Sequence, residues 1–290
     1  MLLTLLDSLN GSVGHTDFQK LLLLFTHECE TEPSYEFVPY RFGGFSFTSY
    51  ADKRKLIKKG FLEEDEHKWR LTDEGRHMAK KQTVDPLRMV AFRRKYSKCR
   101  GNALIIEQYR RYPYYANRSE LLNKLPLDAD DLAGIVASKP KSQTPGLLTI
   151  GYEGRSLESY LNELLRASVT VLCDVRSNPL SRKYGFSKKS LKHACEGVGL
   201  RYEHLPELGI PSALRRDLVT QADYDELFLE YERTALPKQV NILSKILEWM
   251  SAGDRVALTC YEKLPEQCHR HCVADAVEQM DGVERGTRHL

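Results

Sequence analysis

Apolar and polar positions in the first part of the chain recur with helical spacing. Between residues 15 and 30 the large apolar side chains fall on one face of a helix, at Phe18, Leu21, Leu22 and Phe25. A second helical segment ends at Gly60, a residue type typical of helix C-termini. We therefore expect two helices here.

A hairpin pattern follows these helices. Residues 61–72 read as two short strands joined by an acidic turn, and Thr72 can cap a short helix after them. Helices followed by a small hairpin and another helix are typical of a winged helix. The pattern predicts a mainly α, winged-helix-like domain over residues 1–82.

The second half of the chain has short apolar runs, which predict buried strands. They cover residues 147–150, 169–173 and 256–259, with a shorter one at 201–205. Helical segments separate them. Strands alternating with helices predict an α/β domain over residues 147–290, a Rossmann-like doubly wound parallel sheet.

Two segments lie between these domains. Residues 83–127 are expected to form a basic helical extension. Residues 128–146 are poor in large apolar side chains and end in a stretch rich in lysine, proline and serine, which is typical of a linker.

Basic side chains predominate from Arg76 to Arg118, opposed along the chain only by Asp85 and Glu107, and tyrosines lie among them. Cations bind phosphate and aromatic rings stack on bases, so this mixture predicts a nucleic-acid surface. The alternative is a helical connector with a solvated charged face and inward-packed tyrosines. The candidate contacts are Lys80, Lys81, Arg93, Arg94, Lys95, Arg110 and Arg111.

Composition and charge restrict the class of protein and the compartment in which we expect it. The chain of 290 residues is 41% hydrophobic and 29% charged, as expected of an ordinary globular protein. Its net charge of +3 means that any preference for nucleic acid must come from local clustering. The apolar start at Met1–Leu9 is too short for a signal peptide or membrane span. Seven scattered cysteines favour reduced thiols in the cytoplasm, without a disulfide framework.

Chemically versatile side chains follow two of the predicted strands. Asp174 and Arg176 follow one strand, and Cys260 and Glu262 follow another, with His269 a little further on. Ligands of open α/β sheets bind beyond the carboxyl ends of the strands. The sequence therefore predicts a single site at that edge of the sheet.

Residues 147–280 resemble the family called domain of unknown function 488. The resemblance is carried by TIGYEGRSLESYLNELL, DVRSNPLSRKYGFSKKSL, YEHLPELG and VALTCYEKLPEQCHRHCVADAV. It implies a Rossmann-like sheet and a site formed from Asp174, Arg176, His204, Cys260, Glu262, His269 and Arg270.

Residues 15–80 resemble, more loosely, the winged-helix-like domain called Panacea, or the SocA-like antitoxin domain. The matching segments are FQKLLLLF, FVPYRFGGFS and LIKKGFLEE. No catalytic motif comes with this resemblance.

Each candidate residue has a functional and a structural interpretation. The predicted catalytic residues are Asp174, Arg176, His204, Cys260, Glu262 and His269, and the predicted substrate-binding residues are Tyr152, Arg155, Ser177, Arg182 and Arg270. Asp174 could instead cap a turn or pair with Arg176, and His204 could be satisfied by a backbone carbonyl. Cys260 could be a nucleophile or a buried apolar filler.

We expect no metal and no other cofactor. Cys260, Cys268, His269 and Cys272 offer ligand types, but Cys268 and His269 should point to different faces of a helix starting near Pro265. No CxxC pair is present.

These features together predict a nucleic-acid-processing hydrolase. It would act on DNA rather than RNA, on modified bases, by glycosylase-like cleavage of an N-glycosidic or similar bond. Two alternatives stay open: a non-catalytic nucleic-acid or nucleotide-binding regulator or defence sensor, and a thiol enzyme or small-molecule transferase using Cys260. The expected partner is nucleic acid and not a membrane, and homodimer formation is left open.

Overall fold

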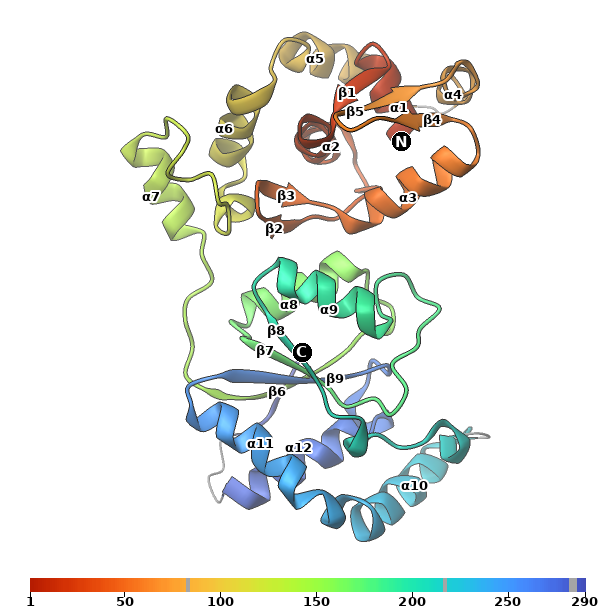
Figure 1. Ribbon diagram of the computed structural model, residues 1–290, viewed down its shortest axis with the longest axis vertical. Helices are drawn as coiled ribbons and strands as arrows, with labels where there is room; N and C mark the ends of the chain where they lie inside the picture. Colours follow the sequence, from red (N-terminus) through yellow and green to blue (C-terminus); the bar gives the residue numbers. More distant parts are fainter. Residues whose placement is uncertain (82–83, 216–217, 282–285) are drawn as a thin grey trace. The chain divides into compact units, whose positions relative to one another are not determined.

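Two groups of helices and strands, each with its own core, make up the structure (Figure 1). The computed structural model describes residues 1–81, 84–215, 218–281 and 286–290. The first group is unit 1, Met1–Lys139, and the second is unit 2, Pro140–Leu290. Within the described residues, no helix is both long enough and apolar enough to cross a membrane.

Unit 1 is mainly helical, as predicted. Its helices are α1 (Leu2–Ser8), α2 (His15–Cys29), α3 (Phe47–Lys58), α4 (Asp73–Ala79), α5 (Pro86–Tyr96), α6 (Gly101–Arg111), the short 3-10 helix η1 (Pro113–Ala116) and α7 (Ala129–Ala137). The predicted apolar face of α2 is wider than its spacing suggested, because every residue from Leu21 to Phe25 is fully buried. Gln19 and Lys20 are buried as well. Helix α2 is therefore the central helix of this unit.

Two small antiparallel sheets complete unit 1. The predicted strand pair is β4 (Leu62–Glu64) and β5 (Lys68–Leu71), and Thr72 caps α4 by accepting a bond from the backbone of Gly75 at 3.0 Å. The sequence did not indicate the remaining strands, which are β1 (Ser12–Gly14), β2 (Val38–Tyr40) and β3 (Gly43–Phe45). Each has three residues, too few for an alternating pattern, whereas β4, which is equally short, was marked by the acidic turn before β5. Strand β1 joins β5, and β2 pairs with β3.

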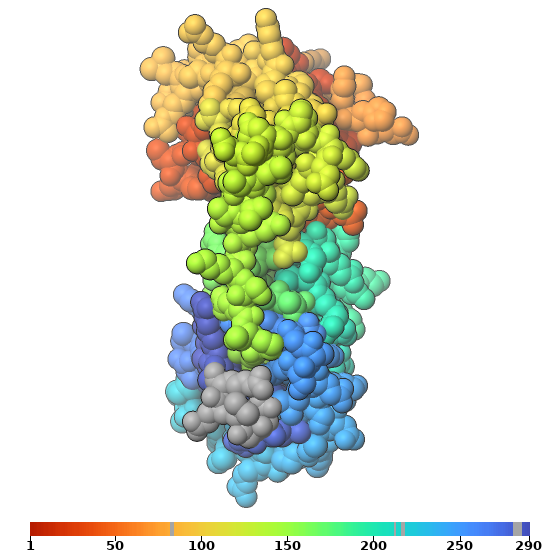
Figure 2. All heavy atoms as spheres, turned by 90° about the vertical axis from the view of Figure 1, so that its left-hand side faces the viewer, coloured from red at the N-terminus to blue at the C-terminus, as the bar shows by residue number. Residues whose placement is uncertain are grey.

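Residues 128–146, which the sequence predicts to be a linker, contain the helix α7. Asp128 caps the helix and forms a capping box with Asp131. Ile135 is 1% exposed and packs in a small core with Ile105 and Tyr109. One well-placed isoleucine and a strong cap are enough to anchor a short helix that composition alone assigns to a linker. Helix α7 lies in the yellow-green part of the surface in Figure 2.

Unit 2 is the predicted α/β domain. Its strands are β6 (Gly146–Gly151), β7 (Val171–Asp174), β8 (Arg201–His204), β9 (Arg255–Cys260) and β10 (Arg288–His289). They form one parallel sheet in the order β10-β6-β9-β7-β8. Its α-helices are α8 (Leu157–Arg166), α9 (Lys188–Gly197), α10 (Gln221–Thr234), α11 (Val240–Ser251) and α12 (Arg270–Asp281), and its 3-10 helices are η2 (Pro206–Leu208), η3 (Ser212–Arg215), η4 (Leu236–Gln239) and η5 (Pro265–Gln267).

Helices cover both faces of this sheet. Figure 1 shows α8 and α9 on one face and α11 and α12 on the other. Strand β9 lies between β6 and β7, and Cys260 at its end is in register with Gly151. The carboxyl ends of three neighbouring strands therefore meet at one place, where an open α/β sheet binds its ligands.

Gly151 permits a close crossing at this edge. A Cβ atom at residue 151 would lie 1.8 Å from the carbonyl oxygen of Glu262, which is closer than any side chain allows. The loop after β9 therefore passes directly over the end of β6. This crossing positions Glu262 beside Cys260.

Candidate active site

A pocket of about 310 Å³ opens where β6, β7 and β9 end. Its walls come from the loops after these strands and from η3. The lining residues are Tyr152, Arg176, Ser177, Asn178, Leu180, Ser181, Arg182, Ile210, Arg215, Cys260, Tyr261, Glu262 and His269. Seven of the residues predicted for the site are among them: Tyr152, Arg176, Ser177, Arg182, Cys260, Glu262 and His269.

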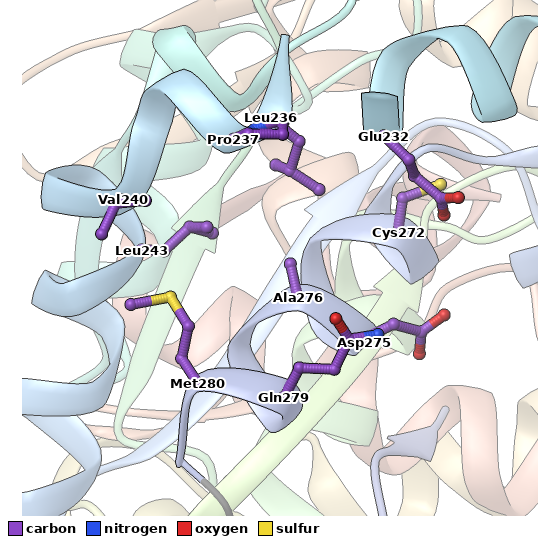
Figure 3. A pocket seen from close by; sticks show the side chains of 10 residues that line it. All are labelled: Glu232, Leu236, Pro237, Val240, Leu243, Cys272, Asp275, Ala276, Gln279 and Met280. Atoms are coloured by element: carbon purple, nitrogen blue, oxygen red, sulfur yellow. The ribbon is translucent and has the colours of Figure 1, made fainter. Parts of the chain in front are cut away.

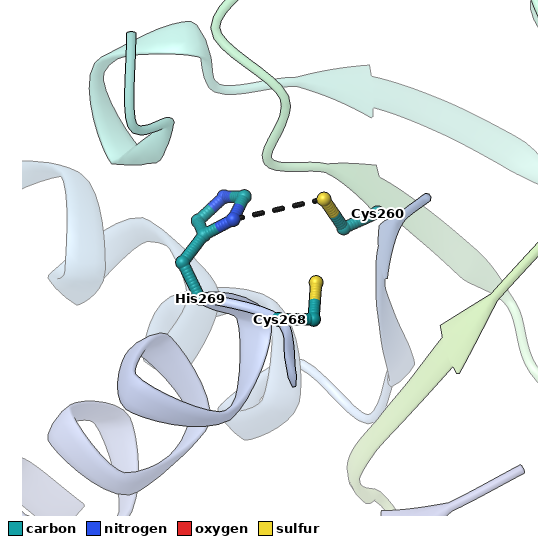
Figure 4. Close-up of side chains that lie close together, drawn as sticks. All are labelled: Cys260, Cys268 and His269. Atoms are coloured by element: carbon teal, nitrogen blue, oxygen red, sulfur yellow. Dashed lines mark hydrogen bonds between the residues drawn. The ribbon is translucent and has the colours of Figure 1, made fainter. Parts of the chain in front are cut away.

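The Cys260 sulfur is the centre of a buried polar cluster. It lies 3.6 Å from Nδ1 of His269 and 3.5 Å from Oε2 of Glu262. Cys268 also directs its sulfur toward Cys260 (Figure 4). The guanidinium of Arg215 lies 3.9 Å away. Cys260 is fully buried, so these groups and not water determine its protonation.

The pKa values of the two neighbouring thiols, Cys260 and Cys268, shift in opposite directions. Burial favours the neutral thiol, but a hydrogen bond from Cys268 and the charges of His269 and Arg215 outweigh burial and place the pKa of Cys260 well below its usual value. Burial, together with the bond to Cys260, raises the pKa of Cys268 well above its usual value. The arrangement therefore favours the thiolate form at Cys260 and the thiol form at Cys268.

His269 is held so that one ring nitrogen faces Cys260. Its Nε2 lies 3.0 Å from the carbonyl oxygen of Val175, which can only accept, so Nε2 carries a hydrogen. Nδ1 is then free to exchange a proton with Cys260. When Nδ1 is unprotonated, it accepts from Arg215 at 3.3 Å.

Arg215 and Glu262 form an ion pair at the mouth of the cluster, with 3.2 Å between Nη2 and Oε1. Burial, and secondly the charge on Cys260, raise the pKa of Glu262, and Arg215 opposes this rise. Arg215 could not be located from the sequence, because it ends the short helix η3, 45 residues before Cys260, and follows no strand.

Asp174 and Arg176 bond to each other beneath the pocket. Arg176 donates to Asp174 from Nε at 2.8 Å and from Nη2 at 2.5 Å, and the Tyr202 hydroxyl donates to Asp174 at 2.6 Å. Arg176 directs Nη1 to the Tyr152 hydroxyl and the Phe186 carbonyl, each at 2.9 Å. Asp174 is fully buried and does not line the pocket. The geometry thus favours the structural interpretation over the predicted catalytic one.

Three other predicted site residues lie outside the pocket lining. His204 bonds through Nε2 to the Arg176 carbonyl at 2.8 Å, which is the structural alternative foreseen for it. Arg270 is fully buried and donates to the carbonyls of Glu262, at 2.6 Å, and Lys263, at 2.9 Å. It holds the loop after β9 and does not face a ligand. Arg155 is half-buried and does not line the pocket.

The remaining predicted binding residues line the pocket in different ways. Tyr152 is buried and stacks on Phe186, with 4.4 Å between the ring centres. Ser177 donates its hydroxyl to the Ile210 carbonyl at 3.0 Å. Arg182 is exposed, and within the described part of unit 2 it forms no ion pair. Arg182 therefore has a cationic group available for a ligand.

The reason given for excluding a metal at Cys260 is wrong. Helix α12 begins at Arg270, so Cys268 and His269 precede it and both reach Cys260. Ligand atoms of the three residues lie within 4.8 Å of one another. The Arg215 guanidinium, however, stands beside Cys260, His269 and Glu262 and already supplies positive charge. A divalent cation there would be repelled, so the thiolate interpretation fits this cluster better.

The predicted nucleic-acid contacts differ in whether they already form an ion pair with an acidic side chain. Lys95 pairs with Glu28 at 3.1 Å, Arg110 with Asp131 at 2.8 Å, and Arg111 with Glu28 at 3.4 Å. Glu28 and Asp131 lie outside the stretch from Arg76 to Arg118, so they were not counted among the acids that oppose its basic side chains. Tyr96 and Tyr109 are each 1% exposed and pack inward.

All seven candidate contacts are exposed, but four of them form no ion pair among the described residues. They are Lys80, Lys81, Arg93 and Arg94. No ion pair of Arg93 or Arg94 occurs among the residues that the structure describes.

The family comparison concerns unit 2 alone. Residues 156–277 match the family described as Domain of unknown function DUF488, so the chain carries a DUF488 domain over this range. Comparison with curated proteins and with solved structures finds no match. Nothing supports the expected likeness of residues 15–80 to the Panacea or SocA-like domain.

Proposed function

We propose that unit 2 is a thiol-dependent enzyme in which Cys260 forms a covalent bond with an electrophilic carbon of its substrate. One observation carries the proposal: the Cys260 sulfur lies 3.6 Å from Nδ1 of His269, in a buried cluster that favours the thiolate. The thiolate is the nucleophilic form of cysteine, and an adjacent imidazole is its usual activator.

The cluster can account for every proton in such a step. Cys260 enters the step as the thiolate with its proton on Nδ1 of His269, and Nε2 keeps its hydrogen and donates it to the Val175 carbonyl. The thiolate then forms the sulfur–carbon bond, and the leaving group departs with the proton from Nδ1. Water or a second acceptor attacks the same carbon, returns a proton to Nδ1 and releases the Cys260 sulfur.

The cations around the pocket favour a substrate with an anionic group. Arg182 is exposed at the rim, and Arg215 lies directly above Cys260. An anion held by Arg182 and Arg215 would lie over the Cys260 sulfur and limit the access of other reagents to it. A pocket of about 310 Å³ suits a small molecule or one end of a longer one.

A second candidate is the nucleic-acid-processing hydrolase predicted above, favoured by the exposed and unpaired Arg93 and Arg94 in the described part of unit 1. Asp174 is a poor choice for its catalytic carboxylate, since Arg176 and Tyr202 occupy both oxygens. Glu262 is the carboxylate that lines the pocket and would take that role. Binding of nucleic acid without turnover, as a regulator or defence sensor, is the non-catalytic form of this candidate.

Alkylation of the native protein tests the thiol proposal. We expect iodoacetamide at pH 6 to modify Cys260 at least about ten times faster than Cys173 or Cys195, because burial raises the pKa of both of these thiols. Mass spectrometry of peptides gives the rate at each cysteine. His269→Asn should slow the modification of Cys260 at pH 6 and leave the other two unchanged.

Inorganic phosphate serves as the probe for the anion site. We expect it to slow alkylation of Cys260, and to do so less in Arg182→Ala than in Lys189→Ala, an exposed position that does not line the pocket. Cys260 modified no faster than Cys195 would remove the thiol proposal. Equal protection in the two variants would remove Arg182 from the anion site.

A further inference from the structure

A second group of metal-binding side chains lies on helices α10 and α12, outside the pocket. Glu232 comes from α10, and His271 and Cys272 come from the first turn of α12. One ligand atom of each lies within 4.8 Å of those of the other two. Glu232 is distant in sequence, so no spacing pattern connected these residues.

His271 is oriented as a metal-binding histidine is. Its Nδ1 lies 2.9 Å from the Pro265 carbonyl and 2.8 Å from the Cys268 carbonyl, so Nδ1 carries the hydrogen. Nε2 then has no hydrogen, and its lone pair is available to a metal. Nε2 lies 3.4 Å from the Cys272 sulfur. Metal-binding histidines commonly donate their other nitrogen to a backbone carbonyl in this way.

The spacing of the two atoms matches a tetrahedral metal. A sulfur at about 2.3 Å and a nitrogen at about 2.0 Å from zinc lie about 3.5 Å apart. The observed distance of 3.4 Å is close to this value, but the same sulfur lies 4.0 Å from Nδ1, which places it beside the ring. The Cys272 side chain would therefore turn toward the Nε2 lone pair when metal binds. Phe228 packs edge-on against the His271 ring, with 5.1 Å between ring centres, and helps to fix its orientation.

The surroundings of this cluster are acidic. Glu232 and Asp275 stand beside Cys272, and no lysine or arginine forms an ion pair with either acid among the residues with described positions. This is the opposite of the Cys260 cluster, where Arg215 already supplies the positive charge. A cation would therefore be attracted here.

The cluster also opens to solvent. Glu232, Cys272 and Asp275 form one wall of a pocket of about 530 Å³. Figure 3 shows the Glu232 carboxylate next to the Cys272 sulfur, with Leu236 and Val240 on other sides of the pocket. Water can therefore reach the fourth position of a tetrahedral site.

We propose that Glu232, His271 and Cys272 bind a zinc ion, with water from the adjoining pocket as the fourth ligand. Thiolate, imidazole and carboxylate together suit zinc better than calcium or magnesium, which prefer oxygen ligands alone. The site would join α10 to α12. The inference does not depend on the chemistry proposed for Cys260.

Cobalt provides the probe, because Co²⁺ takes the same ligands and gives a thiolate charge-transfer absorption. Metal-free full-length protein, prepared with a chelator, should bind one equivalent of Co²⁺ with this absorption, and Zn²⁺ should displace it. We expect Cys272→Ser to lose the absorption and Glu232→Gln to bind Co²⁺ at least about tenfold more weakly. Cys260→Ser, at the other thiol cluster, should keep both the absorption and the affinity.

Three results would overturn the inference. They are binding of less than one equivalent, loss of the absorption in Cys260→Ser with retention in Cys272→Ser, and unchanged affinity in Glu232→Gln. Circular dichroism of each metal-free variant separates loss of a ligand from loss of the fold. Glu232→Gln keeps the size of an exposed side chain, so it remains informative if Cys272→Ser fails to fold.

Discussion

Single residues at the strand ends show what alternation along a strand can and cannot predict. Asp174 and Arg176 lie two positions apart, so their side chains share a face. The sequence therefore predicted that they would be neighbours. It could not show that they bond to each other, because that depends on Tyr202 and Tyr152, which come from other elements.

Asp174→Asn should destabilise unit 2 instead of merely inactivating it. The change leaves the buried Arg176 without its counter-charge, which costs about 3–5 kcal/mol. Urea denaturation followed by circular dichroism would measure this. Glu203→Gln, which weakens a pair with Arg201 at 3.7 Å between more exposed groups, should cost less than about 1 kcal/mol. Equal stabilities of the two variants would contradict the structural role of Asp174.

Lys20 gives a prediction about pH. It is 2% exposed, and its ammonium group donates to the Gly44 carbonyl at 3.2 Å. Burial lowers the pKa of Lys20 to about 7, from an ordinary value of 10.5. Between these values the unfolded chain holds a proton that the folded chain lacks, so the free energy of unfolding should rise with pH in that window.

Lys20→Met should remove this dependence. The variant should be more stable than the unchanged protein, by roughly 3 kcal/mol at pH 6 and by much less at pH 10, because the cost of burying the charge is present only while Lys20 is protonated. Urea denaturation at the two pH values measures the difference. If the gain is the same at both, Lys20 does not titrate in this range.

At the scale of elements, length decides what the sequence predicted. Strand β4 was marked by the acidic turn that joins it to β5, and the long helix α2 and strands β6 to β9 have enough residues to show a period. Strands β1, β2 and β3 do not. The site follows the same rule: Cys260 and Glu262 were located by the end of β9, whereas Arg215 ends η3, which is too short to show a period.

Helix α7 was missed because its stability depends on one buried side chain. Ile135 is 1% exposed and Val136 is 63% exposed, so they form a matched pair on the same helix. Ile135→Ala should lower the free energy of unfolding of unit 1 by about 2–4 kcal/mol. Val136→Ala should change it by less than about 0.5 kcal/mol. Thermal and urea denaturation would compare them, and equal effects would mean that α7 is not anchored to the core.

At the scale of the whole chain, the two units have separate cores, and the family match lies entirely in unit 2. What unit 1 binds is therefore a separate question. Composition located its basic stretch but could not identify which charges are neutralised, since Glu28 and Asp131 become partners only through folding.

We expect unit 1 to bind duplex DNA through Arg93 and Arg94, which form no ion pair among the described residues. Replacing Arg93 and Arg94 with alanine should weaken binding and reduce the slope of log affinity against log salt by about 2, since two fewer phosphate contacts release fewer counterions. Fluorescence anisotropy with labelled DNA over a range of salt measures both. Arg110→Ala, which removes a cation already paired with Asp131, should have the smaller effect. An unchanged slope in the double variant would exclude this surface.

The position of Cys268 has a consequence for every experiment on unit 2. Its thiol donates to Cys260, and its carbonyl accepts from His271 at 2.8 Å. Cys268 therefore contacts both groups of side chains, the one around Cys260 and the one around Cys272. A substitution at residue 268 that changes both alkylation and cobalt binding would not mean that the centres share a ligand. To tell the two centres apart, Cys260 and Cys272 are substituted one at a time. Each variant is then measured in both the alkylation assay and the cobalt assay.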